Sequence, residues 1–172
     1  MKNKYLFDLA LRYLIIILIS LNGLSLIYLI FKPLTINLVY YILKLFDNSV
    51  ILSDNLILLD GFYAEIISAC IAGSAYYLLL VLNLTTPMKI KKRLLSLSLS
   101  ITIFYLINVF RIIFFIFLFE NSAALFNLTH KIAWYAGSTI FLVLIWFLTV
   151  YIFKINQMPV YSDVKYLIKE FK

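Results

Sequence analysis

Residues 94–119 read LLSLSLSITIFYLINVFRIIFFIFLF, and Arg111 is the one charged side chain among them. About 20 consecutive apolar residues are enough for a helix to span the hydrocarbon core of a membrane. The whole chain has the same character, since 65% of its 172 residues are hydrophobic and 13% are charged. A soluble domain carries roughly 25% charged residues. The sequence therefore predicts an integral membrane protein, with a single membrane domain over residues 1–172.

Three other stretches also predict spanning helices, namely Leu9–Phe31, Phe62–Leu84 and Leu128–Phe153. Together with Leu94–Phe119 they give an all-α protein with about four transmembrane helices. Most of the 15 Lys and Arg residues fall in the N-terminal flank, in the loop 85–93 and in the tail 154–172. The positive-inside rule then makes both termini, this loop and the tail cytoplasmic. The net charge of +7 is thus a topology signal, and it does not predict nucleic-acid binding.

The longest segment between predicted helices is an outer loop over residues 33–61. Its first part, PLTINLVYYILKLF, has apolar residues at helical spacing, which predicts an amphipathic helix lying in the membrane interface. Its second part has two short apolar runs around SDN, and turn-forming residues between such runs favour a small hairpin.

Arg111 is a candidate functional residue, because a charge inside the bilayer is expensive. An arginine at the centre of a spanning helix costs about 2.5–3.5 kcal/mol on insertion scales. Arg111 lies about eight residues below the outer end of its predicted helix, roughly 12 Å deep. Asn108 comes three residues earlier and shares the same helical face. The pair predicts a polar pocket. The alternative, a side chain that snorkels to the outer interface, is strained at that depth.

Cys70 is the only cysteine, and it lies in YAEIISACIAGSAYYLLLVL, residues 63–82. It too is about eight residues from the outer end of its predicted helix, so the thiol and the guanidinium are expected at matching depth. Small residues around it, including Gly73 and Ser74, let helices approach closely. A lone cysteine in an apolar helix is usually a small buried hydrophobe, but a cationic neighbour increases its thiolate fraction. One cysteine excludes an internal disulfide and a CxxC redox pair.

His130, the only histidine, lies at the outer start of the fourth predicted helix. By itself a histidine at an interface is more often a polar anchor than a base. A cysteine, an arginine and a histidine from three helices, all in the outer half, together permit acyl transfer. His130 would accept the proton of Cys70 and return one to the leaving amine, and Arg111 would stabilise the thiolate or the oxyanion. Three acidic residues are open candidates for orienting His130: Asp60, Glu65 and Glu120.

The chain resembles the exosortase/archaeosortase family of membrane cysteine transpeptidases. The motifs that carry the resemblance are ACIAGS around Cys70, NVFRI with Asn108 and Arg111, and THKIAWYAG with His130. They fall in the family's order between about residues 65 and 137. The pattern differs at one point, since the family's glycine follows the cysteine by two residues and Gly73 follows it by three. This chain also has four predicted helices where many relatives have more.

The resemblance implies an enzyme with Cys70 as nucleophile, Arg111 as stabiliser and His130 as acid/base. It implies as partner the C-terminal sorting tail of an exported protein, which consists of a short motif, a spanning helix and a basic cluster. The enzyme would cut near the motif and pass the new C-terminus to a membrane lipid or another acceptor. Low alanine with high isoleucine and lysine is typical of an AT-rich prokaryote. The expected location is therefore a prokaryotic cytoplasmic membrane, with the site facing outward.

Two other functions remain open from the sequence. Ser74 follows a glycine in AGSAY, so a serine intramembrane protease could use Ser74 with His130 as base, but this leaves Arg111 unexplained. A non-enzymatic scaffold or accessory subunit would use the many aromatic residues for lipid packing, and would need a partner's carboxylate for Arg111. One cysteine and one histidine fall short of the ligands of a usual zinc site, so neither a metal nor a cofactor is predicted.

Overall fold

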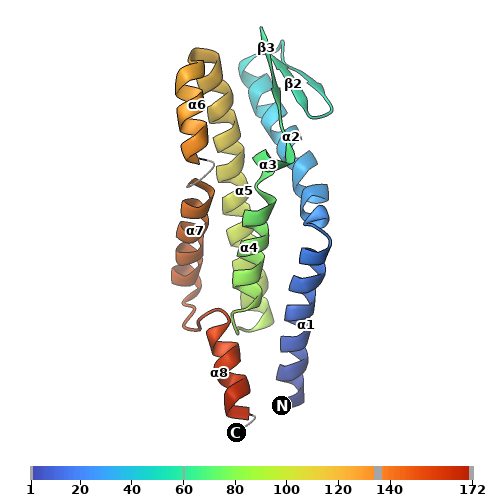
Figure 1. Cartoon of the computed structure of the whole chain (residues 1–172), viewed down its shortest axis with the longest axis vertical. Coiled ribbons are helices and arrows are strands. Elements are labelled where there is room, and N and C mark those ends of the chain that lie inside the picture. The colour runs from blue at the N-terminus through green and yellow to red at the C-terminus, as the bar shows by residue number, and fades with distance from the viewer. Residues whose placement is uncertain (1, 60, 134–136, 171–172) are drawn as a thin grey trace.

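The computed structural model describes residues 2–59, 61–133 and 137–170 and is mostly helical (76%). Within these ranges the helices are α1 (Lys2–Leu21), α2 (Ser25–Phe46), α3 (Ser68–Ile71), α4 (Gly73–Leu84), α5 (Ile90–Asn121), α6 (Ala123–Ile132), α7 (Ser138–Phe153) and α8 (Tyr161–Glu170). The strands are β1 (Ile51–Ser53), β2 (Leu56–Leu59) and β3 (Phe62–Glu65). Figure 1 shows an elongated molecule with the sheet at one end and both chain termini at the other.

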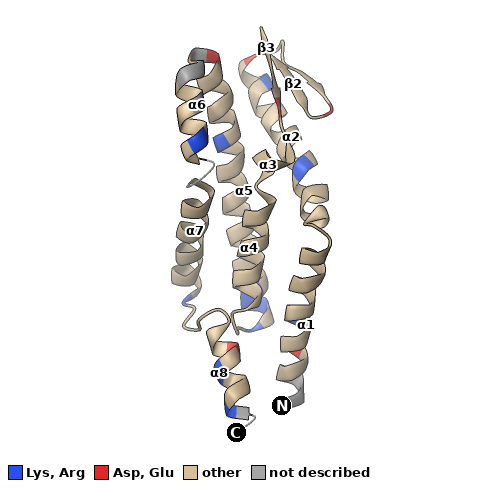
Figure 2. Cartoon of the chain, viewed as in Figure 1, with Lys and Arg blue, Asp and Glu red and all other residues tan. Residues whose placement is uncertain are grey.

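Two of the described helices are long and apolar enough to cross a membrane, Ser25–Phe46 and Ile90–Glu120. The segments Ser68–Leu84 and Ser138–Phe153 are apolar but shorter. Helix α5 is central, because it contacts α2, α4, α6 and α7. Charged residues gather toward the two ends of the molecule and leave its middle almost free of charge (Figure 2). This distribution is the one expected of a protein whose middle faces hydrocarbon.

The predicted helix Leu9–Phe31 is wrong, because the chain breaks between α1 and α2. Gly23 and Leu24 have φ of 59° and 63°, and the N–H of Ser25 donates to the carbonyl of Asn22 at 3.0 Å. An Asn-Gly pair is a turn signal, and glycine takes a positive φ without steric cost. The sequence carried this signal inside an otherwise apolar run.

The first part of the predicted outer segment 33–61 is helical, as predicted, but this helix is not separate, because α2 continues through Pro33 to Phe46. The spacing of apolar residues there is helical, as expected, but the packing differs. Thr35, Ile36, Val39 and Leu43 are buried. Other apolar side chains at helical spacing, Leu34, Tyr41 and Leu45, are exposed. Lipid is as apolar as a protein interior, so apolar spacing does not identify the face that packs.

The predicted hairpin is present, and it has a third strand. β1 and β2 pair antiparallel, with Ile51 opposite Leu58, and β2 and β3 pair antiparallel, with Leu56 opposite Glu65. The predicted helix Phe62–Leu84 is therefore wrong at its start, and the fold is all-α apart from this small sheet. Exposure along residues 62–66 alternates with the period of two that a strand requires. Ile66 is buried and closes this segment against the core.

The other two predicted helices are present with different bounds. The helix predicted as Leu94–Phe119 is α5, which begins at Ile90, so the loop predicted as 85–93 is shorter. The helix predicted as Leu128–Phe153 is divided into α6 and α7, and residues 134–136 between them lie outside the described residues. The tail 154–172 contains α8, which packs against the first helix.

Ion pairs, of which Arg12–Asp163 is fully buried, join α1, α5 and α8 at the end of the molecule where the termini lie. The guanidinium of Arg12 donates to both carboxylate oxygens of Asp163, each at 3.2 Å, and both side chains are almost fully buried. Asp8 forms ion pairs with Arg12 at 3.1 Å and Arg93 at 3.4 Å. The hydroxyl of Tyr5 donates to Asp163, and burial together with this carboxylate raises the pKa of Tyr5 to about 12. Each buried charge here has a partner of opposite sign.

Candidate active site

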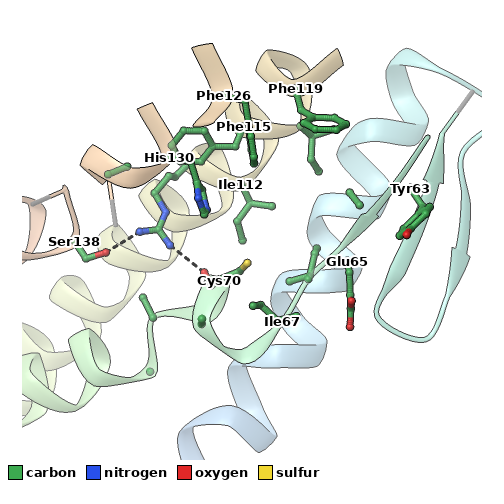
Figure 3. A pocket seen from close by; sticks show the side chains of 18 of the residues that line it. Tyr63, Glu65, Ile67, Cys70, Ile112, Phe115, Phe119, Phe126, His130 and Ser138 are labelled. Carbon is green, nitrogen blue, oxygen red and sulfur yellow. Dashed lines mark hydrogen bonds between the residues drawn. The ribbon is translucent and has the colours of Figure 1, made fainter. Parts of the chain in front are cut away.

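A cavity of about 560 Å³ lies between β3, the start of α4, α5, α6 and the start of α7. The three residues predicted to act together, Cys70, Arg111 and His130, all line it. The sulfur of Cys70 points from α3 into this cavity, and aromatic side chains of α5 and α6 face it from the opposite wall (Figure 3). Gly73 and Ser74, the predicted supporting residues on the Cys70 segment, line the same cavity.

Cys70 is displayed by a break in its helix. Ala72 adopts the left-handed conformation, with φ 57° and ψ 47°, so α3 ends at Ile71 and α4 begins at Gly73. In a continuous helix the carbonyls of Cys70 and Ile71 would accept from the N–H groups of Ser74 and Ala75. Here the N–H of Ala75 donates to Ala72 instead, at 2.9 Å. The break therefore leaves these two carbonyls in need of other donors.

Asn108 and Arg111 of α5 supply those donors. The amide of Asn108 donates to the carbonyl of Cys70 at 3.1 Å and to that of Ile71 at 3.3 Å. The guanidinium of Arg111 donates to the same Cys70 carbonyl at 3.1 Å. The two residues expected to share a face of one helix thus hold the backbone of the cysteine in place. Broken helices inside membranes are tolerated where neighbouring groups satisfy the freed backbone in this way.

Arg111 also connects α5 to α7, because its Nη1 donates to Ser138 Oγ at 2.7 Å (Figure 3). Among the described residues no carboxylate forms an ion pair with Arg111, in contrast to Arg12. Among the described residues the hydrogen-bond partners of this half-buried guanidinium are neutral, so its charge is not offset by a neighbouring carboxylate in the cavity that it lines. Such a group stabilises negative charge that develops there, and more strongly than it would in water.

His130 reaches the cavity from the last turn of α6, and not from the start of a spanning helix as predicted. Its ring is stacked on Phe126, with centroids 5.1 Å apart and planes at 13°, and meets the edge of Phe115 at 5.3 Å. Figure 3 shows the imidazole projecting between these rings and Cys70. Stacking holds the plane of the imidazole, and the ring lies in the wall of the cavity that Cys70 also lines.

Of the acidic residues left open as partners of His130, Glu65 lines the cavity but its Oε1 accepts from Asn55 Nδ2 at 3.0 Å. Asp60 lies outside the described residues. Glu120 is an exposed residue of α5 that does not line the cavity. Among the described residues no group of three or more His, Cys, Asp or Glu could hold a metal ion.

The sequence did not identify Ser138 or Tyr28 as part of the site. Ser138 follows Gly137 at the point where small residues interrupt an apolar run, which is a weak signal for a polar contact. Tyr28 of α2 lies against Gly73, so close that a Cβ on this glycine would be 2.6 Å from the tyrosine Cζ. This contact joins residues far apart in the chain, and nothing local in the sequence indicates it.

The break at Ala72 predicts opposite effects of two neighbouring substitutions. Ala72→Gly should raise the free energy of unfolding by about 0.5–1 kcal/mol, because an L-residue in the left-handed region costs about 1–2 kcal/mol and glycine recovers part of it. Gly73→Ala should lower it by about 1–3 kcal/mol, because the new methyl group overlaps the ring of Tyr28. Denaturant unfolding in detergent micelles measures both. A destabilising Ala72→Gly would contradict the left-handed geometry.

One of three comparisons with known proteins found a match. A family model described as transmembrane exosortase matches residues 2–150, which is most of the chain. No curated protein and no solved structure matches it. The matched range includes every residue that contributes to the cavity.

Proposed function

Because the chain belongs to the transmembrane exosortase family, we propose that it is a membrane cysteine peptidase or transpeptidase. The family acts on C-terminal sorting signals of its substrates. The observation that supports this chemistry is the shared cavity of Cys70, His130 and Arg111, in which the arginine has no described carboxylate partner. A nucleophile, a proton carrier and a group that stabilises an oxyanion are the components of acyl transfer, and a cation can serve as the third.

In the proposed reaction, Sγ of Cys70 attacks the carbonyl carbon of the scissile peptide while His130 takes the thiol proton. The carbonyl oxygen becomes an oxyanion, which Arg111 stabilises together with the N–H groups at the start of α4. Collapse of this intermediate breaks the C–N bond, and His130 gives its proton to the departing amine. The exported chain is then a thioester on Cys70. A hydroxyl or amine of the acceptor, or water, attacks it and restores the thiol.

The substrate in this proposal is a sorting tail whose own helix spans the membrane beside the enzyme. The cavity is lined by residues of β3, α3 and α6 among others. These three elements lie toward the end of the molecule opposite both termini (Figure 1). With the termini in the cytoplasm of a prokaryotic cell, the cavity faces the outer side, where the exported part of the substrate emerges. A membrane lipid is a suitable acceptor, because exposed apolar side chains on α5 and α6 lie next to the cavity.

A trapped intermediate tests the proposal. The substrate is a tail reporter, a soluble domain fused to a sorting tail encoded in the same genome with its motif, spanning helix and basic cluster. After an acid quench, we expect a hydroxylamine-labile adduct of the reporter on the peptide that contains Cys70. His130→Gln should slow its formation by about 10²–10⁴-fold, the usual contribution of a general base. Processing through a hydroxylamine-resistant adduct, or through one on another residue, would contradict the assigned nucleophile.

A further inference from the structure

Strand β3 leads directly into the segment that carries Cys70, and it forms one edge of its sheet. The strand order is β1-β2-β3, so β3 is paired on the side of β2, and the described residues place no strand on its other side. All residues from Phe62 to Ile67 line the cavity. An edge strand presents a row of unpaired N–H and C=O groups, which is a template for pairing with another extended chain.

The hydrogen bonds identify which backbone groups are available on this edge. The N–H of Ile66 donates to the carbonyl of Asn55 at 2.9 Å, so Ile66 belongs to the set that bonds toward β2. Along an antiparallel strand, successive residues direct their N–H and C=O groups to opposite sides. Phe62 and Ala64 therefore also bond toward β2, whereas the backbone groups of Tyr63 and Glu65 are directed away from it. Past this point the carbonyl of Ile67 accepts from Cys70, which ends the strand.

We propose that the sorting tail binds as an additional strand on the free edge of β3, pairing with the backbone of Tyr63 and Glu65. This inference rests on the proposed function, and it names how the substrate is held. Main-chain pairing gives affinity to an extended peptide of any sequence, while side-chain pockets give specificity. Beyond the paired edge the bound tail continues toward Cys70. In the enzyme, Cys70 lies in α3, which begins three residues after the end of β3 at Glu65 (Figure 3).

The direction of pairing follows from the topology of the tail. β3 runs from the tip of the sheet toward α3 (Figure 1), which carries Cys70. A sorting tail runs from its exported domain toward its own spanning helix, which is the same direction. Pairing is therefore parallel. Successive side chains of the tail point to opposite faces of the enlarged sheet, so every second motif residue faces the cavity wall that Phe115, Phe119 and Phe126 form.

Amide hydrogen exchange tests this pairing without requiring catalysis. The Cys70→Ala chain is incubated with the tail reporter, and exchange is resolved to single amides by fragmentation. We expect the amides of Tyr63 and Glu65 to exchange at least about tenfold more slowly when the tail is added. Leu52, which lies on the opposite free edge of the same sheet by the register of β1, should not change. An unchanged rate at both Tyr63 and Glu65, whether the tail binds elsewhere or not at all, would overturn the proposal.

Proline variants supply a kinetic test in the native chain. Tyr63→Pro and Glu65→Pro each remove one free N–H, and Tyr63→Ala and Glu65→Ala are their controls. Each proline variant should have a KM about fivefold to tenfold higher than its alanine control, which corresponds to the free energy of one lost hydrogen bond. Leu52→Pro, which removes a free N–H on the opposite edge, should leave KM unchanged. Proline variants that process the tail like their alanine counterparts would overturn strand pairing and leave the cysteine chemistry intact. If no hydroxylamine-labile adduct formed on Cys70, the proposed cysteine mechanism would be wrong, whatever the result of the hydrogen-exchange experiment.

Discussion

Cys70→Ala should lower the rate of tail-reporter processing by about 10⁴-fold or more, whereas Ser74→Ala should lower it by less than about tenfold. Removing the nucleophile of a covalent mechanism typically leaves only the contribution of substrate binding and oxyanion stabilisation. The sulfur of Cys70 lies in the cavity, next to the break between α3 and α4. Asn108 and Arg111 donate hydrogen bonds to the backbone carbonyl of Cys70 at this break. Ser74 also lines the cavity, but on the first turn of α4.

Cys70→Ser is a useful companion, because it keeps an oxygen nucleophile at the same position. A hydroxyl ionises far less readily than a thiol, so this variant should also be close to inactive unless a stronger base assists it. The rate of membrane proteolysis is measured by loss of the tail from the reporter on a gel, with the folded fraction checked for each variant. If Ser74→Ala were inactive and Cys70→Ala active, the serine protease interpretation would replace the cysteine one.

From the helical rise per residue, the sequence predicts that Cys70 and Arg111 lie at the same depth in the membrane. Both residues do line one cavity, but the segment before Cys70 is not the helix on which that count depended. Residues 62–65 are a strand, in which each residue advances about 3.3 Å and not 1.5 Å, and a short turn follows. The alternation of Phe62, Ala64 and Ile66 with Tyr63 and Glu65 is readable as a strand. Length and hydropathy alone favour one helix over residues 62–84, because the four residues of this strand are few compared with the apolar residues that follow them.

The break at Ala72 could not be predicted from local propensity, since alanine is the best helix former. The informative sign is the spacing that the resemblance implies, with a glycine expected two residues after the cysteine, where this chain has Ala72 in the left-handed conformation. Tertiary hydrogen bonds from Asn108 and Arg111 stabilise the break, and these contacts join residues 38 and 41 positions apart. The shared face of Asn108 and Arg111, by contrast, follows from the helical period and is confirmed.

The half-buried Arg111 and the buried Arg12 should respond differently to the same substitution. Arg111→Met is expected to reduce processing by about 10²–10³-fold, the usual loss when one donor to an oxyanion is removed. Its free energy of unfolding should change by less than about 1 kcal/mol. The lost hydrogen bonds to Ser138 and to the Cys70 carbonyl are offset, because an unpaired charge is no longer buried and Asn108 still donates to that carbonyl.

Arg12→Met is the matched control at the other end of the molecule. It leaves Asp163 buried without its cation and should cost about 3–5 kcal/mol of unfolding free energy, while the folded fraction retains its processing rate. Arg111→Lys separates charge from geometry, since an ammonium keeps the charge but cannot bridge Ser138 and Cys70 as the planar guanidinium does. We expect it to be intermediate in activity. If Arg111→Met instead lost stability like Arg12→Met and kept its processing rate, Arg111 would be a structural residue, and the oxyanion would need another donor.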